Sequence, residues 1–351
     1  MNFLRNTWYA CATAAELSDN LLPRTLLGEP IVFYRKRDGT AVALRDRCPH
    51  RFVPLHIGKI VDDNVQCGYH GLQFNGSGQC VRSPFDARIA KIAKVQAYPL
   101  EERYSMLWIW MGDPALADPG MIPDFGCLVD PRRKQVSGYT RVQANYELVV
   151  DNLADLSHAS FLHGSFIAQE GLDRATHKVV EEAGSVYSKF WYPEALIPPL
   201  FGAYYEDRQA IVDRWSEIRW DAPCSVLLWA GVTPPGRQRS DGIDLFGVHL
   251  LAPETEHSTH YFYCHCRGFK LADPATDELV MNWQQVAFHE QDKPMLNAQQ
   301  RAMGDVTDLM SLKPLLLATD AGAVRIRKSL HKRIQAEAKE ATRSEASTTA
   351  T

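Results

Sequence analysis

The sequence has no long apolar run, no block of like charge and no hydrophobic segment at its start. Its apolar stretches, such as Cys224–Val232, reach only about half of the roughly 18 consecutive residues that a membrane span needs. Lys and Arg number 38 against 42 Asp and Glu, so the net charge is −4, and no basic run indicates nucleic-acid binding. Residues 1–6 lack the apolar core of a secretory signal. We therefore expect a cytoplasmic protein that binds neither membrane nor nucleic acid.

Cysteine is also sparse, with eight residues in 351, which argues against a disulfide framework. Cys48 and Cys67 are distinctive because each lies close to histidines. The other six lie among apolar neighbours and are expected to be buried reduced thiols: Cys11, Cys80, Cys127, Cys224, Cys264 and Cys266. With 45% hydrophobic residues, a chain of this length can form two domains without covalent or metal support.

The first third of the chain has the pattern of short strands. Ile31–Arg35 and Ala41–Asp46 flank an Asp-Gly pair, a strong hairpin signal, and Met106–Trp110 indicates another strand. Three prolines within residues 114–123 mark a linker. An all-β domain over residues 1–118 is therefore predicted.

The remaining two-thirds mixes both periodicities. Residues 145–166 have helical spacing, whereas residues 180–263 are rich in β-branched and aromatic side chains. Asp273-Pro274 predicts the start of a helix that Pro294 should kink or end. We predict an α+β protein whose second domain, 119–335, has an antiparallel sheet flanked by helices, and a disordered tail at 336–351.

Two short motifs supply four metal ligands. Cys48-Pro49-His50 and Cys67-Gly68-Tyr69-His70 each contain one thiol and one imidazole, and sixteen residues separate His50 from Cys67. Structural zinc accepts such ligands, as does a [2Fe–2S] cluster with two cysteines on one iron and two histidines on the other. The Cys-x-His half is unusual for zinc motifs, whose first pair is commonly spaced by two to four residues. Neutral imidazoles raise the reduction potential of a cluster, which suits an electron relay.

These motifs resemble the Rieske cluster motif, Cys-x-His followed after a spacer of about this length by Cys-x-x-His. The flanking residues agree as well, in Cys48-Pro-His-Arg51 and Cys67-Gly-Tyr-His-Gly71. The resemblance implies that Cys48, His50, Cys67 and His70 hold a [2Fe–2S] cluster.

A second group of polar residues lies past the linker. Asn152, Asp155, His158 and His163 fall within twelve residues, and steps of three place the first three on one helix face, roughly 60° apart. His163 would lie about 140° from His158 in a straight helix. The two histidines can bind one metal only if the helix bulges or breaks between them, and we predict that distortion.

Two histidines with one carboxylate form the facial triad of non-haem Fe(II) oxygenases, which leaves positions open for O₂ and substrate. Spacing alone does not identify the carboxylate. The block Asn-x-x-Asp-x-x-His with a second His is similar to the iron motif of Rieske non-haem iron oxygenases. In that family the third ligand is an Asp on a late helix, which implies Asp292, with Glu290 as the second choice.

The resemblance extends from Asn6 to Arg325 and is closest to the oxygenases typified by vanillate O-demethylase and dicamba monooxygenase. The segments Gly112–Pro119 and Asp151–His158 look like that subgroup. It implies a homotrimer in which Asp155 links His70 of one subunit to His158 of its neighbour, with Asp155 and Asn152 as catalytic residues. It also implies that a ferredoxin or flavin reductase passes electrons from NADH to this chain. The chain has no Gly-x-Gly-x-x-Gly dinucleotide fingerprint in a strand–helix setting, so it should not bind NADH itself.

The expected reaction is O-demethylation of a vanillate-like methoxybenzoate by O₂, which releases formaldehyde. Trp229, His249 and Trp283 are the substrate-binding candidates; by resemblance His249 and Trp283 match positions that contact a substrate carboxylate, and Trp229 replaces an Asn. The alternatives are methyl or ring hydroxylation of another aromatic acid such as a toluenesulfonate, or a protein without catalysis, either a Rieske electron carrier or a zinc-binding protein.

Overall fold

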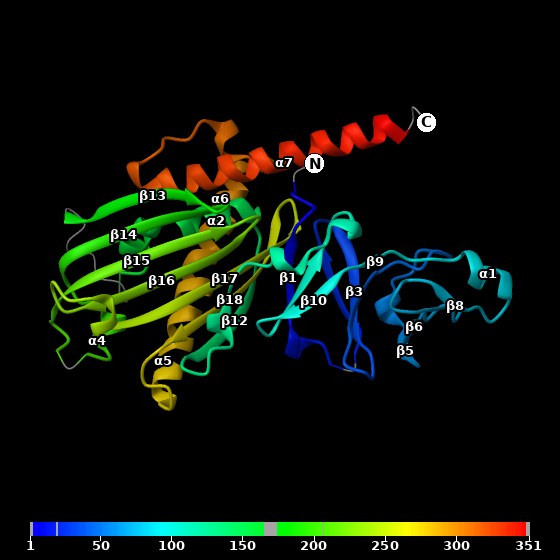
Figure 1. Ribbon diagram of the computed structural model, residues 1–351, viewed down its shortest axis with the longest axis horizontal. Coiled ribbons are helices and arrows are strands. Elements are labelled where there is room, and N and C mark those ends of the chain that lie inside the picture. Colours follow the sequence, from blue (N-terminus) through cyan, green and yellow to red (C-terminus); the bar gives the residue numbers. More distant parts are fainter. Residues whose placement is uncertain (1–2, 19, 165–173, 206, 349–351) are drawn as a thin grey trace. The chain divides into compact units, whose positions relative to one another are not determined.

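The computed structural model describes residues 3–18, 20–164, 174–205 and 207–348 (Figure 1). The described chain divides into two compact units. One holds Arg5–Ile122 together with Ala252–Thr255, and the other holds Pro123–Leu251 and the chain from Glu256 onward, with Phe3 and Leu4. The division at Ile122 falls inside the proline-rich segment in which the sequence predicted a linker, slightly beyond residue 118.

The first unit contains three small antiparallel sheets, of strand order β2-β3-β4-β9, β5-β6-β7-β8 and β1-β11-β10. It has one short α-helix, α1 (Ala87–Ile92). The strands are β1 (Trp8–Thr13), β2 (Leu22–Leu26), β3 (Glu29–Arg35), β4 (Ala41–Arg45), β5 (Lys59–Val61), β6 (Asn64–Gln66), β7 (Gln73–Phe74), β8 (Cys80–Arg82), β9 (Ala97–Tyr98), β10 (Leu100–Arg103) and β11 (Met106–Trp110).

The predicted hairpin is formed by β3 and β4, which pair from Arg35↔Ala41 to Ile31↔Arg45. The turn closes through the Lys36 N–H, which donates to the Thr40 carbonyl at 2.9 Å, and Gly39 has a φ of 87° that favours glycine. The β-rich first domain is therefore confirmed.

The second unit contains one seven-stranded antiparallel sheet of order β12-β18-β17-β16-β15-β14-β13. Its strands are β12 (Lys134–Val142), β13 (Thr176–Glu182), β14 (Ser185–Leu196), β15 (Ile211–Asp221), β16 (Ser225–Thr233), β17 (Ile243–Thr255) and β18 (Ser258–Arg267). Its helices are α2 (Tyr146–Ala154), α3 (Ala159–Leu162), α4 (Pro199–Gly202), α5 (Pro274–Gln284), α6 (Lys293–Met303) and α7 (Ala321–Thr348). This sheet with its flanking helices confirms the predicted α+β class (Figure 1).

Strand alternation assigns the side chains of β16 and β17 to two faces of this sheet. Leu228 pairs with Gly247 and Trp229 with Phe246, without a bulge. Because successive side chains point to opposite faces, Leu228 and His249 lie on one face and Trp229 lies on the other.

Two predictions about helices need correction. The chain from Asp273 stays helical past Pro294, because a π-helix (Gln285–Asp292) joins α5 to α6. Pro294 lies in the first turn of α6, where the N–H that proline lacks would have no helical acceptor. The predicted disordered tail is wrong for residues 336–348, which extend α7. This segment is rich in Ala, Glu, Lys and Arg, which are strong helix formers. Residues 349–351 lie outside the described residues.

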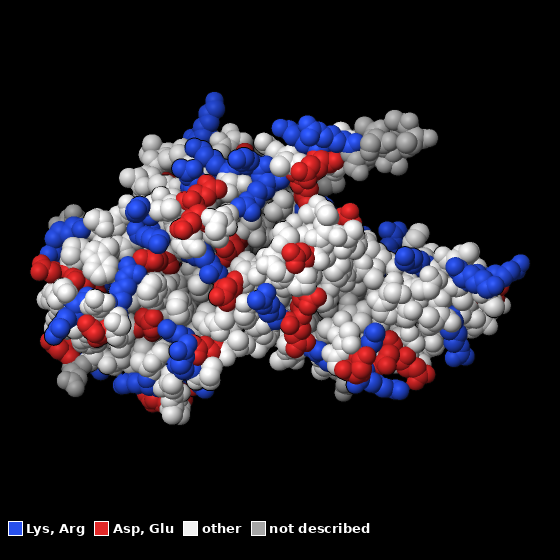
Figure 2. Space-filling view, in the orientation of Figure 1, with Lys and Arg blue, Asp and Glu red and all other residues white. Residues whose placement is uncertain are grey.

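Charges of both signs are interspersed over the seven-stranded sheet on the face shown in Figure 2. None of the helices in the described ranges combines the length and the hydrophobicity that crossing a membrane demands.

Candidate metal centres and substrate cavity

Two loops of the first unit share one backbone pattern and carry the four predicted cluster ligands. In each loop the cysteine N–H donates to the carbonyl five residues later, and the residue four positions later donates back to the cysteine carbonyl. That fourth residue has a positive φ in both loops, 61° at Phe52 and 73° at Gly71. The donor–acceptor pairs are Cys48 to Val53 (2.9 Å), Phe52 to Cys48 (2.9 Å), Cys67 to Leu72 (2.8 Å) and Gly71 to Cys67 (3.1 Å).

The ligands of these loops differ in exposure. Cys48 and Cys67 are each 2% exposed and belong to the hydrophobic core of the unit. The rings of His50 and His70 lie 4.4 Å apart between centroids, and His50 is exposed. Burial raises the pKa of the Cys48 thiol to about 11, and the nearby Cys67 thiol acts in the same direction. A metal must therefore supply the positive charge that makes these thiols ligands.

The arrangement fits two irons better than one zinc. A tetrahedral ion about 2.0–2.3 Å from its ligands holds all of them within roughly 4 Å of one another. Among the described residues, one group of three or more His, Cys, Asp or Glu side chains has all its ligand atoms within 4.8 Å of one another, and it consists of His158, His163 and Asp292. The four cluster ligands are therefore spread more widely than the ligands of one zinc ion. A [2Fe–2S] cluster of this kind binds two cysteines on one iron and two histidines on the other. Here the Cys48 thiol lies near that of Cys67, and the rings of His50 and His70 are 4.4 Å apart between centroids.

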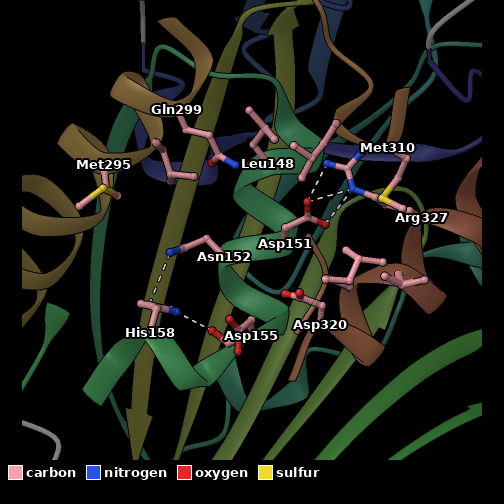
Figure 3. A pocket seen from close by; sticks show the side chains of 15 residues that line it. Leu148, Asp151, Asn152, Asp155, His158, Met295, Gln299, Met310, Asp320 and Arg327 are labelled. Carbon is pink, nitrogen blue, oxygen red and sulfur yellow. Dashed lines mark hydrogen bonds and ion pairs between the residues drawn. The ribbon is translucent and has the colours of Figure 1, made fainter. Parts of the chain in front are cut away.

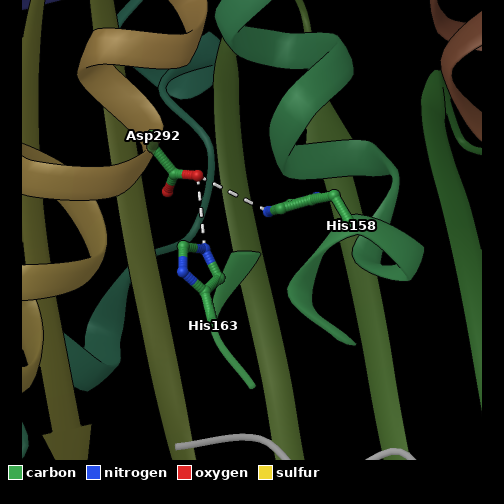
Figure 4. A group of neighbouring side chains, drawn as sticks. All are labelled: His158, His163 and Asp292. Atoms are coloured by element: carbon green, nitrogen blue, oxygen red, sulfur yellow. Dashed lines mark ion pairs between the residues drawn. The ribbon is translucent and has the colours of Figure 1, made fainter. Parts of the chain in front are cut away.

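The second centre is formed by His158, His163 and Asp292 (Figure 4). Asp292 Oδ1 lies 3.6 Å from His158 Nε2 and 3.2 Å from His163 Nε2. Ligand atoms about 2.1 Å from one metal and at right angles lie roughly 3 Å apart, so the three side chains fit adjacent positions on one ion. Two imidazoles and one carboxylate are the ligands of a non-haem Fe(II) facial triad.

The helix break lies before both histidines, at Asp155, and not between them as predicted; between them the chain passes from a 3-10 helix into α3 (Ala159–Leu162). Helix α2 ends at Ala154, Asp155 is extended with φ −106° and ψ 97°, and a short 3-10 helix (Leu156–His158) leads into α3. His163 follows the last residue of α3. The change from the 3-10 helix to α3 and the end of α3 at Leu162 separate the two histidines, and the Nε2 atoms of both lie near Asp292 Oδ1.

Asp292, rather than Glu290, completes the triad because it lies at the inner end of the π-helix. Asp292 is buried, whereas Glu290 is exposed. Gln291, which precedes Asp292, accepts a hydrogen bond from His163 Nδ1 at 2.7 Å. This bond leaves His163 Nε2 to face the metal position. Burial opposes the charged form of His163, but the hydrogen bond and charge of Asp292 outweigh burial, and the pKa of His163 is raised.

Comparison with known proteins supports both centres. Residues 7–99 match the Rieske [2Fe-2S] domain, and residues 142–336 match the vanillate O-demethylase oxygenase C-terminal domain. The oxygenase component of dicamba O-demethylase from Stenotrophomonas maltophilia is 41% identical over 340 residues, which cover 96% of this chain and 100% of that protein. The chain belongs to the vanillate O-demethylase family of Rieske oxygenases. It therefore carries a [2Fe–2S] cluster and a mononuclear iron.

Other relatives of this Rieske oxygenase act on different substrates. A vanillate O-demethylase oxygenase subunit from a Pseudomonas species is 32% identical, covering 95% of this chain and 96% of that protein. The iron-sulfur subunit of toluene-4-sulfonate monooxygenase from Comamonas testosteroni is 35% identical, covering 95% and 98%. The crystal structure of dicamba monooxygenase bound to dicamba has a TM-score of 0.89 and 40% identity, covering 96% of this chain and 99% of that one.

Helix α2 of the Rieske oxygenase is tied to α7 beside the iron position. Arg327 on α7 donates to Asp151 at 2.7 Å and to Glu147 at 2.9 Å, and both acceptors lie on α2. Burial raises the pKa of Asp151 to about 6, although the Arg327 charge lowers it. These ion pairs hold the helix that presents Asn152.

A cavity of about 210 Å³ lies beside this helix pair, and both predicted catalytic residues line it (Figure 3). The Asn152 amide lies 3.5 Å from His158 Nε2. His158 Nδ1 donates to the Asp155 main-chain carbonyl, while the Asp155 carboxylate accepts from the Ser157 N–H at 2.9 Å. Asp155 therefore orients the iron ligand through its backbone and presents a carboxylate at the cavity.

A second cavity, of about 80 Å³, lies on the sheet face that carries Leu228. Leu156 and Ala159, which flank His158 in the sequence, form part of its wall. Its volume is below the roughly 150 Å³ that holds benzene in an engineered apolar cavity, so an aromatic ring would enter only with shifts of the wall side chains. The described lining consists of Leu156, Ala159, Tyr192, Pro198, Leu200, Phe201, Arg214, Trp215, Ser216, Leu228, Ala230, Leu245 and Trp283.

The three predicted substrate residues do not meet at this cavity. Trp283 lines it. His249 lies on the same sheet face but belongs to a buried cluster, where its Nδ1 bonds the Tyr261 hydroxyl at 2.7 Å, and burial lowers its pKa to about 4. Trp229 lies on the opposite face of the sheet, where its Nε1 donates to Asp244 at 2.8 Å, so the structure does not place its side chain in this cavity. Leu228, the adjacent residue, lines the cavity in its place.

Proposed function

We propose that this chain is the oxygenase component of an O-demethylase that oxidises the methyl group of a methoxylated aromatic acid, with a vanillate-like methoxybenzoate as substrate. The observation that carries the proposal is the His158–His163–Asp292 triad, next to which Leu156 and Ala159 form a wall of a largely apolar cavity. Pockets for small organic molecules are mostly apolar with a few placed polar groups. Relatives of the chain are named for O-demethylation of dicamba and of vanillate.

The proposed reaction consumes one methoxyarene, O₂, two electrons and two protons, and yields a phenol, formaldehyde and water. One oxygen atom is inserted into a methyl C–H bond, and the other leaves as water. The resulting hemiacetal breaks its methyl carbon–oxygen bond, which releases formaldehyde and the phenol. The iron supplies the O₂ chemistry, while the protein positions the methyl group and excludes water.

The two electrons come from outside the chain. Oxygenase components of this family receive electrons from a separate redox partner, and we propose an NADH-dependent ferredoxin or flavin reductase. The partner's electrons would enter at the cluster ligands, where His50 is exposed beside the exposed side chains of Phe52 and Tyr69.

We also propose that three copies assemble head to tail, with Asp155 linking His70 of one subunit to His158 of the next. Asp155 and His158 both line the 210 Å³ cavity, so a neighbouring histidine could reach the Asp155 carboxylate there. The exposed apolar side chains around the cluster ligands support a protein contact, since such patches mark interaction surfaces. They are Phe52, Ile57, Tyr69 and Phe85.

Methyl hydroxylation of an aromatic sulfonate is the second candidate. The observation in its favour is the 35% identity to a toluene-4-sulfonate monooxygenase subunit. The same triad can serve both reactions, because each begins with oxidation of a methyl group held near iron.

The deciding experiment is an assay of the iron-loaded protein with a reductase and a panel of methoxybenzoates, anisole-type neutral analogues and toluenesulfonates. Release of formaldehyde in equal amount to the phenol supports O-demethylation. A benzylic alcohol from toluenesulfonate, without formaldehyde from any methoxybenzoate, would replace the first proposal with the second. Metal analysis beforehand should give about three irons per chain and no zinc.

A further inference from the structure

His265 is a buried histidine beside the proposed substrate cavity, and sequence reasoning did not single it out. It lies on β18 and is 2% exposed. It lines a space of about 10 Å³. Leu200, Leu245 and Trp283 line both this space and the cavity of about 80 Å³. The two spaces therefore adjoin, and His265 lies next to the site proposed for the substrate.

The hydrogen bonds around His265 determine which ring nitrogen carries the proton. Gln284 Nε2 lies 2.8 Å from the Val136 carbonyl oxygen and 2.8 Å from His265 Nδ1. A carbonyl only accepts, so the amide nitrogen of Gln284 faces Val136, and its second N–H is donated to His265 Nδ1. Burial, with a smaller contribution from nearby His249, lowers the pKa of His265 well below 6.5, so the ring is neutral. Its one proton is therefore on Nε2.

The Nε2–H of His265 is a buried donor that bonds no group in the part of the chain that the structure describes. Two other residues that line the same space, Arg267 and Trp283, also carry buried N–H groups without an acceptor among the described residues. A buried donor without an acceptor costs about 1–3 kcal/mol, so such groups are uncommon unless a ligand or water satisfies them. A space of about 10 Å³ is at the lower limit for one water. It therefore has room for one acceptor atom.

The described lining of this small space carries no net charge. Arg267, the one charged residue in that lining, is paired with Asp277 at 2.7 Å. A carboxylate placed beside the neutral ring of His265 would lack a compensating charge. The oxygen of a hydroxyl needs no such charge and has two lone pairs that accept hydrogen bonds. The acceptor that fits this space is therefore an uncharged oxygen.

Gly247 keeps open a niche between His265 and the larger cavity. It lies on β17, opposite Leu228 of β16, and on the same sheet face as His249. A Cβ at residue 247 would lie 3.0 Å from His249 Nε2, 3.4 Å from His265 Nε2 and 3.4 Å from Leu228 Cβ. Leu228 itself lines the cavity of about 80 Å³. Any side chain at residue 247 would therefore crowd the space between the two imidazoles and that cavity.

We propose that His265 donates a hydrogen bond from Nε2 to a ring hydroxyl of the substrate and so selects methoxybenzoates that carry one. The inference rests on the proposed function and narrows its substrate class to hydroxylated methoxybenzoates, of which vanillate is one. A site that bonds a substrate hydroxyl disfavours the analogue without it, because the buried donor is then left unpaired. His265 is thus a specificity-determining residue.

The test measures ligand binding to the iron-loaded protein under anaerobic conditions, by calorimetry. The ligands are a methoxybenzoate without a hydroxyl and the isomers that carry one ring hydroxyl, vanillate among them. The wild-type protein should bind at least one hydroxylated isomer about tenfold or more tightly than the parent compound. His265→Phe keeps a flat ring but removes the Nε2–H, so it should reduce this preference to within about threefold.

His257→Phe is the matched control. It makes the same exchange in the turn between β17 and β18, away from the described lining of both cavities, so it should keep the wild-type preference within about twofold. Gly247→Ala is a second test variant, because it crowds the niche and leaves His265 in place; it should also reduce the preference. The cluster spectrum and the melting temperature report whether each variant folds. If His265→Phe fails to fold, Gly247→Ala and the wild-type preference decide.

Equal binding of the parent compound and all hydroxylated isomers by the wild-type protein would overturn the inference and leave a water as the acceptor of His265. A His265→Phe variant that weakens every ligand by the same factor and keeps the preference would overturn it too. These outcomes do not depend on turnover, so they are separable from the proposed reaction. A preference that depends on His265, without formaldehyde, would remove O-demethylation and leave the hydroxyl site standing. Formaldehyde from the parent compound, without any preference, would do the reverse.

Discussion

The Asn152 side-chain amide donates a hydrogen bond to Asp292 Oδ1 at 3.3 Å, and this carboxylate oxygen also faces both histidines of the triad. Asn152 lies on α2 and Asp292 at the end of the π-helix, 140 residues later. One amide therefore connects the two helical segments that supply the iron ligands. Hydrogen-bond partners of this kind, which contact a metal ligand and not the metal itself, hold that ligand in the orientation that binds the metal.

Asn152→Ala should weaken iron binding at the triad by about 10–100-fold, because Asp292 loses the donor that orients it. The measurement is the dissociation constant for Fe(II), with the cluster spectrum as an internal reference for the first unit. Gln299→Ala is the control, since it shortens an amide that lines the same cavity (Figure 3). Iron affinity equal to wild type in Asn152→Ala would contradict the orienting role.

Asp292→Asn should abolish stable iron binding, whereas Glu290→Gln should leave it unchanged. The neutral amide keeps the shape of Asp292 but removes the anion that compensates the ferrous charge. Glu290 is exposed and bonded to Gln285 at 3.4 Å, away from the histidines. Iron per chain after anaerobic loading distinguishes the two. The assignment fails if Glu290→Gln loses iron and Asp292→Asn retains it.

The two centres should be separable by mutation. His158→Ala removes a triad ligand, so it should keep the visible cluster spectrum and abolish oxygenation. Cys67→Ala removes a cluster ligand from the core of the first unit, so the cluster colour should disappear. Absorption spectra and product formation are measured on both variants. Turnover retained by His158→Ala would refute its role as a ligand.

The ligand motifs were predictable because their chemistry is local. Cys48, His50, Cys67 and His70 lie on two matching loops. The spacing of His158 and His163 predicted a break between them, whereas the helix breaks before both, at Asp155. Asp292 was accessible only through family resemblance, because no periodicity connects α2 with a helix that begins far later in the chain. Gln291, which bonds His163, was missed for the same reason.

The cavity residues were harder to predict because strand register is a tertiary property. A shift of one residue moves a side chain to the other face of a sheet, and this is the difference between Trp229 and Leu228. Arg214 lies in a β-rich stretch where a charged residue usually faces solvent, so nothing local indicated its burial. The long α7 helix was underestimated because residues 336–348 look polar all round.

His331 on α7 should make stability depend on pH. Its hydrogen bond to Glu147, 2.9 Å from Nε2, raises the pKa of His331 above its ordinary value of 6.5. A raised pKa favours protonation in the folded state, so the contribution is complete below about pH 6.5 and is lost as pH rises through the higher folded value. Between pH 6 and 8.5 the melting temperature of wild type should fall by about 1–2 °C more than that of His331→Gln. Lys332→Gln changes an exposed neighbour and should show the same pH dependence of the melting temperature as wild type. If the melting temperatures of all three proteins change equally with pH, His331 does not make stability depend on pH.

Asp155→Asn should slow electron transfer without removing either metal. Asn also caps the Ser157 N–H, so the backbone that orients His158 should persist while the carboxylate charge disappears. In the proposed trimer this charge links His70 of one subunit to His158 of the next. We expect cluster oxidation in a single turnover, with substrate and O₂ present, to slow by at least about 100-fold at unchanged iron content. Asp320→Asn, a carboxylate that lines the same cavity, is the matched control and should oxidise its cluster at the wild-type rate (Figure 3). Wild-type rates in Asp155→Asn would show that the carboxylate serves only as a helix cap.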